Sequence, residues 1–209
     1  GIYYPDKTRV GWWQNGYPKY FAKVLNATNW IGIKVKVDGE NFDLSKCKVK
    51  EFKRILNMQD GYLYRKLTAE LESGKIIKIE AKRFVSIANK EIGALKYSIT
   101  PVNFSGEVVF EPYLDGDIKN TDANYDEKFW DEVDRKVDNN LAHLSLKTKK
   151  LDFIVTTAMN YEVRVDNTKV KLVSEVQNRE KYVGNSLIVK AKKQSTVTLF
   201  HKSQSCYYI

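Results

Sequence analysis

The stretch KIIKIEAKRFVSIANKEIGALKYSITPVNFSGEVVFEPYLDGDIKN, residues 75–120, decides the fold of this chain. Its first third alternates between two kinds of side chain. One side carries Ile77, Ile79, Ala81, Arg83 and Val85, and the other carries Lys78, Glu80 and Lys82. Because successive side chains of a β-strand point to opposite faces, this pattern predicts a strand with one buried and one solvated face.

Two further strands follow within the same stretch. Residues 95–99 alternate between apolar and polar side chains up to Pro101, which has no N–H to donate to a central ladder. A short turn leads into a third apolar segment over residues 108–113, which ends in the Leu-Asp-Gly-Asp sequence of residues 114–117. Consecutive strands joined by short turns are typical of an antiparallel sheet.

The same alternation recurs along the rest of the chain. It predicts strands over residues 30–37, 49–56, 62–71, 141–147, 153–163, 169–176, 187–191 and 196–200. Turn sequences such as Asp38-Gly39 separate them. About eleven short strands at this spacing indicate a β-sandwich or barrel. Since no repeat or linker interrupts the pattern, we expect a single all-β antiparallel domain over residues 1–209.

Two segments depart from the alternation. In residues 116–140 a helical spacing predicts one short helix within a long loop, with an apolar face made of Phe129, Trp130, Val133 and Val137. Residues 1–29 are rich in aromatic side chains and broken by glycine and proline, so we expect an ordered loop with a short helical turn at 19–25.

Composition and charge restrict the classes of function. The net charge is +9, but lysines such as Lys34 and Lys36 occupy single outward positions of alternating strands. This distribution indicates a solvated face and argues against a nucleic-acid partner. The sequence lacks an apolar run of about 18 residues and a signal-peptide pattern, so we expect no membrane association. Only Cys47 and Cys206 are available, which favours free thiols and a cytoplasmic location.

Candidate catalytic groups are few. His143 and His201 fall in predicted strands with no carboxylate at a diagnostic spacing, so we predict structural roles for both. Asp115 and Asp117 have a spacing that suits a glycosidase carboxylate pair, although a tight turn explains the same sequence. The following acidic residues do not fit a calcium-binding loop. We therefore predict no catalytic residue and no metal site, and keep both aspartates as candidates for contact with carbohydrate or another domain.

Three tryptophans are further candidates for such contacts. Trp12, Trp13 and Trp30 offer flat rings that can stack on sugar faces, or that can anchor a core or an interface. Trp12 and Trp13 are adjacent, so in an extended chain at most one can be buried. We expect the exposed ring to lie on a contact surface.

Several motifs, taken together and in order, resemble one family. They are Asn29-Trp30-Ile31-Gly32-Ile33, Val37-Asp38-Gly39-Glu40 with Phe42-Asp43-Leu44, Arg83-Phe84-Val85-Ser86, Ala94-Leu95-Lys96-Tyr97 and Leu114-Asp115-Gly116-Asp117. Over nearly its whole length the chain resembles the N-terminal domain of the maltose, kojibiose and trehalose phosphorylases, glycoside hydrolase family sixty-five. The resemblance implies a β-super-sandwich of the galactose-mutarotase-like kind.

The resemblance also implies a parent enzyme that cleaves α-glucoside disaccharides by inverting phosphorolysis. Phosphate would be the co-substrate, without a metal or organic cofactor. Family members carry their catalytic groups on a downstream (α/α) barrel, whose period is missing here, so no catalytic residue is carried over. We expect a non-catalytic domain that packs on the barrel of the same polypeptide and supports a homodimer. Family members also have an upstream segment, so we expect an excised domain that lacks an N-terminal strand and has one unpaired sheet edge.

Two alternatives belong to other classes of protein. The first is a free-standing carbohydrate-binding module. The second is a mutarotase-like enzyme, which the positions of the histidines disfavour because such chemistry uses paired acid and base groups.

Overall fold

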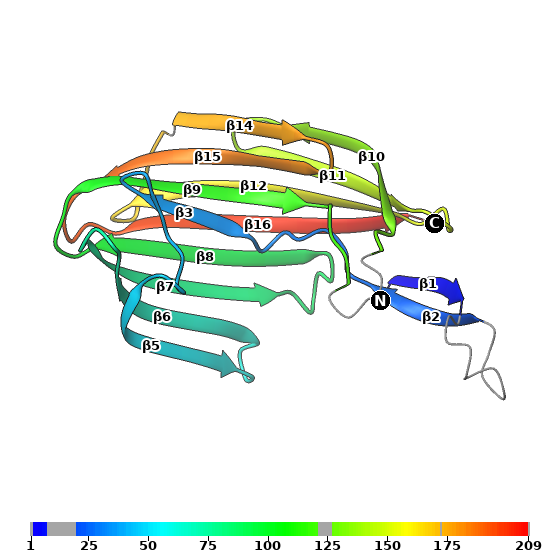
Figure 1. The fold of residues 1–209 in the computed structure, drawn as a ribbon, viewed down its shortest axis with the longest axis horizontal. Coiled ribbons are helices and arrows are strands. Elements are labelled where there is room, and N and C mark those ends of the chain that lie inside the picture. The colour runs from blue at the N-terminus through cyan, green and yellow to red at the C-terminus, as the bar shows by residue number, and fades with distance from the viewer. Residues whose placement is uncertain (1, 8–19, 121–126, 172, 209) are drawn as a thin grey trace.

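Two antiparallel sheets, one larger than the other, make up most of the computed structural model, which describes residues 2–7, 20–120, 127–171 and 173–208 (Figure 1). The larger sheet has the order β10 (Trp130–Val137), β11 (Leu141–Thr148), β12 (Ile154–Val165), β16 (Val197–Tyr208), β8 (Ile92–Pro101), β7 (Ile76–Val85), β6 (Tyr62–Glu70) and β5 (Lys48–Asn57), and β13 (Thr168–Lys169) pairs with β12. The smaller sheet has the order β14 (Val173–Arg179), β15 (Tyr182–Ala191), β9 (Gly106–Asp115), β3 (Ile33–Val37) and β4 (Glu40–Asn41).

The apolar core lies between the inner faces of these sheets. Phe110 of β9 is completely buried, as are Ile77 and Ile79 of β7. The register pairs Ile79 with Ile99 of β8 and with Leu67 of β6, so the apolar positions predicted by alternation form continuous rows across the strands. The predicted all-β antiparallel sandwich is therefore confirmed.

The sheets differ in size, with nine strands in one and five in the other. At the edge of the larger sheet β5 is exposed along nearly its whole length. Figure 1 shows β5 and β6 extending below the strands of the smaller sheet. The inner face of β5, β6 and β7 is therefore only partly covered, and this uncovered area forms the cavities described below.

The described residues of the N-terminal region, 2–7 and 20–29, do not form the loop with a helical turn that the sequence suggested; residues 8–19 of that prediction lie outside the described residues. β1 (Ile2–Lys7) and β2 (Tyr20–Leu25) pair as a separate antiparallel sheet. This sheet contacts the sandwich through Tyr4, whose ring lies edge-on to Phe129 with 4.8 Å between ring centroids. Neither short strand shows a clear apolar–polar alternation, so the glycine and proline signals around them led to the prediction of a loop.

The predicted short helix is also wrong, because its residues form strand β10. β10 pairs with β11, and the register shifts between Glu132 and Asp134. This bulge adds one residue, Val133, to the strand. The regular spacing of two residues between inward-facing side chains is therefore broken at the bulge. A strand with a bulge thus gave an apolar spacing that imitates a helix. All regular elements among the described residues are strands, and none of these residues belongs to a helix that could cross a membrane.

Candidate functional site

Trp30 sits at the entrance to β3, at the end of the sandwich where β7 and β9 finish. Its indole packs on β8, so closely that a Cβ added to Gly93 would lie 2.3 Å from the Cη2 atom of Trp30. The same ring lies edge-on to the imidazole of His201, at 6.3 Å between centroids. The absence of a side chain at residue 93 therefore makes room for the indole, which is half-buried against the core.

A groove of about 760 Å³ opens beside Trp30. One wall is the segment 26–31 before β3 together with residues 118–119 after β9. The opposite wall comes from the start of β6 at Tyr62 and the end of β7 at Phe84. These four chain segments meet here because antiparallel pairing brings strand starts and strand ends to the same end of the sheets.

Asp115 and Asp117 lie next to this groove but do not line it. Backbone hydrogen bonds join Asn29 and Asp115 in both directions, at 2.8 and 3.0 Å, and this bridge extends the pairing of β3 with β9 within the smaller sheet. The Asp115 carboxylate accepts the backbone N–H of Asp117 at 2.9 Å, which forms an Asx turn. Both carboxylate oxygens of Asp117 accept hydrogen bonds from Lys128 Nζ, at 2.7 and 2.6 Å. Each carboxylate thus has a partner within the domain.

Close packing explains why the residue between these two aspartates, Gly116, is a glycine. A Cβ on Gly116 would lie 2.7 Å from the Cδ1 atom of Leu146 on β11. The Leu-Asp-Gly-Asp motif is therefore a turn that packs closely on the larger sheet. Trp12 and Trp13, the other predicted contact residues, lie outside the described residues.

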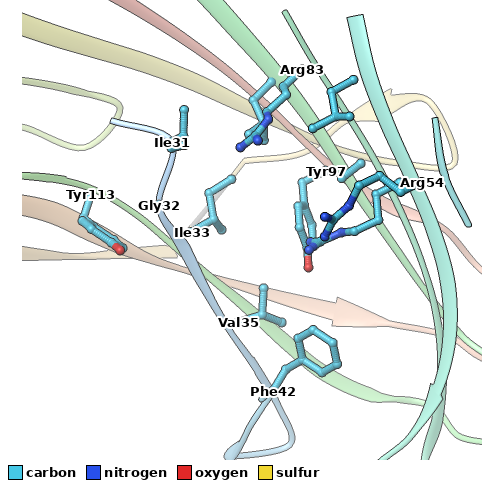
Figure 2. A pocket seen from close by; sticks show the side chains of 13 residues that line it. Ile31, Gly32, Ile33, Val35, Phe42, Arg54, Arg83, Tyr97 and Tyr113 are labelled. Carbon is cyan, nitrogen blue, oxygen red and sulfur yellow. The ribbon is translucent and has the colours of Figure 1, made fainter. Parts of the chain in front are cut away.

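A second cavity, of about 450 Å³, lies between the overhanging strands of the larger sheet and β3. Arg54, Arg65 and Arg83 point into it from β5, β6 and β7. Figure 2 shows Arg54, Arg83 and Tyr97 across the cavity from the side chains of Ile33 and Val35.

The lining tyrosines of this cavity have perturbed acidities. Burial raises the pKa of the Tyr97 hydroxyl, and the nearby Arg65 guanidinium opposes this shift by attraction and a hydrogen bond. Burial also raises the pKa of Tyr113, and the charge of Asp115 adds to the effect. Both phenols therefore stay neutral near neutral pH and offer hydrogen-bonding groups to a ligand.

The two histidines occupy different environments. The Nε2 atom of His143 lies 2.8 Å from Asp134 Oδ2 on β10, a contact that the sequence analysis missed because it placed Asp134 in a helix. His201 on β16 is only 2% exposed, and neither ring nitrogen has a hydrogen-bond partner among the described residues. Burial lowers the pKa of His201 to about 4, so this imidazole is neutral in the folded protein at neutral pH.

No group of three or more His, Cys, Asp or Glu side chains is placed to hold a metal ion anywhere in the part of the chain that the structure describes.

The cluster of Arg54, Arg65 and Arg83 was not predicted from the sequence. The signal was present in part, since Arg83 falls on the inward side of its strand pattern.

Comparison with known proteins identifies the fold. Residues 1–203 match the family described as Glycosyl hydrolase family 65, N-terminal domain. The chain belongs to this family. The predicted resemblance to the maltose, kojibiose and trehalose phosphorylases is therefore confirmed.

Individual relatives of this family-65 domain agree with the assignment. The chain is 38% identical over 185 residues to maltose phosphorylase of Bacillus subtilis (strain 168), which covers 88% of the chain and 24% of the relative. It is 31% identical over 195 residues to α,α-trehalose phosphorylase of Thermoanaerobacter brockii, with the same coverage of 88% and 24%. A solved chain assigned as a kojibiose phosphorylase from the human microbiome superposes with a TM-score of 0.79 at 22% identity, over 91% of this chain and 24% of that chain. The chain thus spans about a quarter of the length of these relatives.

Proposed function

We propose that this family-65 domain is the non-catalytic N-terminal domain of a cytoplasmic enzyme that phosphorolyses α-glucoside disaccharides. In this proposal it packs on a separate (α/α) barrel of the same polypeptide and supports a homodimer. Phosphate is the co-substrate, and neither a metal nor an organic cofactor takes part. The family match and the names of the relatives support the substrate class, and the 24% coverage of maltose phosphorylase supports the presence of a further domain.

The observation that carries the docking proposal is an apolar rim at the groove end of the sandwich. We define this rim by Leu56, Met58, Phe84, Val85 and Ile87. Met58 is 84% exposed and Ile87 is 90% exposed, each at the tip of a β-hairpin turn. The register of β6 and β7 places the two turns side by side. Contiguous exposed apolar side chains on a domain surface mark an interaction site, since water contact with them is unfavourable.

Hydrogen exchange provides the test. The open reading frame that encodes this chain is expressed in full, and amide exchange in residues 57–61 and 86–91 is compared with exchange in the isolated chain. We expect slower exchange in the longer protein, because a docked barrel excludes water from the rim. In the longer protein, Met58→Asp and Ile87→Asp should restore fast exchange and lower phosphorolysis of maltose, trehalose or kojibiose.

The matched control is Val173→Asp on the edge strand β14, where the valine is also largely exposed, at 68%, but lies outside the rim. It should leave both exchange and activity unchanged. Equal exchange of the two turns in the short and long proteins would contradict the docking proposal.

A carbohydrate-binding module is the second candidate, and the groove beside Trp30 and Tyr62 favours it. Titration of the isolated chain with maltose, followed by NMR, separates the two functions. Shifts confined to residues 26–31 and 62 would support sugar binding by the domain itself. Unchanged spectra leave the docking proposal as the explanation of this end of the sandwich.

A further inference from the structure

The three arginines of the smaller cavity form one cluster through strand register. Arg54 of β5 pairs directly with Arg65 of β6 across the sheet. Arg83 of β7 pairs with Leu63, which is two residues before Arg65 on the same face of β6. Since directly opposed residues have Cβ atoms about 5 Å apart, the guanidinium groups converge on one volume.

This arrangement of three positive charges is electrostatically unfavourable by itself. Like charges that lie directly opposite each other on neighbouring strands destabilise the pair. Within the described part of the chain, no carboxylate forms an ion pair with Arg54, Arg65 or Arg83, and none lines the cavity. Nearby charges on the same strands are neutralised, as in the Lys66–Glu80 and Lys50–Glu70 pairs. The cluster therefore has no acidic counter-charge among the described residues, although Arg54 lies 5.5 Å from the centroid of the Phe52 ring and Arg65 is hydrogen-bonded to Tyr97.

The cavity has the form of a small-ligand site. Its volume of about 450 Å³ lies within the range of such sites, and its walls combine apolar side chains with the three arginines. Phe42 and Tyr97 supply aromatic surface, and the tyrosine adds a hydroxyl group. The planar N–H forks of arginine match the oxygen atoms of phosphate and other oxyanions, with two parallel hydrogen bonds for each guanidinium.

We propose that Arg54, Arg65 and Arg83 bind the phosphate group of a small ligand in this cavity, either inorganic phosphate or a sugar phosphate. The anion neutralises the opposed arginines and accepts their N–H donors. Tyr97 and Phe42 contact the sugar ring where the ligand carries one. This site adjoins the apolar rim but shares no residue with it, and the inference holds whether or not the domain packs on a barrel.

Thermal unfolding and calorimetric titration of the 209-residue chain test the inference. Inorganic phosphate and glucose 1-phosphate are compared with sodium chloride at equal ionic strength, which removes general screening effects. We expect a melting temperature that rises with phosphate or glucose 1-phosphate concentration and not with chloride, as for any ligand that binds only the folded state. Tighter binding of glucose 1-phosphate would identify a sugar phosphate as the ligand, and equal binding would identify the phosphate group alone.

The Arg54→Gln, Arg83→Gln double variant should lose about tenfold or more in affinity, because two charge-assisted contacts are removed. In phosphate-free buffer it should unfold at the same temperature as the parent chain or higher, since it relieves like-charge repulsion. The matched control is Lys53→Gln with Lys78→Gln, which removes two charges from the outward face of β5 and β7. The inference is overturned if neither anion stabilises the chain beyond chloride, or if the lysine variant loses as much affinity as the arginine variant.

Discussion

His201 should make the stability of this domain depend on pH between neutrality and pH 4. Its imidazole is enclosed by β16 and its neighbours, with Tyr161 and Leu95 as cross-strand partners and the Trp30 ring edge-on beside it. None of these groups carries a charge that could stabilise the protonated ring. Burial without a partner therefore lowers the pKa of His201 to about 4.

The size of the effect follows from proton linkage. In the unfolded chain a histidine titrates near pH 6.5, so between about pH 6.5 and 4 the unfolded state binds a proton that the folded state does not. The domain therefore has its full free energy of unfolding above the pKa of the histidine in the unfolded chain, and it loses part of that free energy as the pH falls below this pKa. With a folded pKa of about 4, the loss attributable to His201 is about 2 kcal/mol at pH 5 and approaches about 3 kcal/mol at lower pH.

Urea unfolding at about pH 7.5 and about pH 5 measures this loss, with His201→Leu as the test variant. Leucine fits the apolar surroundings, and its substitution removes two ring nitrogens that lack partners. We expect the variant to be at least as stable as the parent chain at the higher pH. Between the two pH values it should lose about 2 kcal/mol less than the parent chain.

Carboxylates also lose stabilising interactions in acid, and they do so equally in the parent chain and in His201→Leu. The difference between the two losses of unfolding free energy therefore belongs to His201. His143→Gln is the control, because it removes the other histidine, which is partly exposed and lies beside Asp134. It should keep the pH dependence due to His201. An equal loss of stability in the parent chain and in His201→Leu would refute the reasoning.

Two glycine substitutions separate packing from backbone strain. Gly93→Ala should destabilise the domain by about 1–3 kcal/mol and change the fluorescence of the folded state, because the new Cβ occupies the space of the Trp30 indole. Denaturant unfolding followed by tryptophan emission checks this, and an unchanged midpoint and spectrum would contradict the packing of Trp30. Gly39→Ala should cost about 1–2 kcal/mol with no change in emission, since Gly39 has φ of +79° and nothing lies within 4 Å of the new Cβ. A cost near zero would mean that the Asp38-Gly39 turn adopts another conformation.

The sequence predicted most strands well because burial on one face imposes a period of two. Residues 76–85 show this clearly, since Ile77 and Ile79 are fully buried while Lys78 and Glu80 between them are exposed. The prediction failed at β10, where a single extra residue shifts the period and produces a helical spacing. A local pattern cannot distinguish a bulged strand from a short amphipathic helix, because only the partner strand β11 fixes the register.

The candidate sites were harder to predict for a related reason. Trp30 and the Leu-Asp-Gly-Asp turn were recognisable from local sequence, and the structure places both at the same end of the sandwich. The arginine cluster depends on the pairing of Arg54 with Arg65, which follows from the length of the turn between β5 and β6. No single strand contains the signal, since each contributes one arginine to the shared face.

The rim and the arginine cavity have a common origin in the unequal sizes of the two sheets. A five-stranded sheet cannot cover the whole inner face of a nine-stranded one, so β5 and the first half of β6 are only partly covered. On the outer face of these strands Lys66 is paired with Glu80. By contrast, the inner face carries unpaired arginines and the adjoining turns carry exposed apolar side chains. Neither feature stabilises the isolated domain. Binding of an anion explains the arginines, and contact with a protein surface explains the exposed apolar side chains.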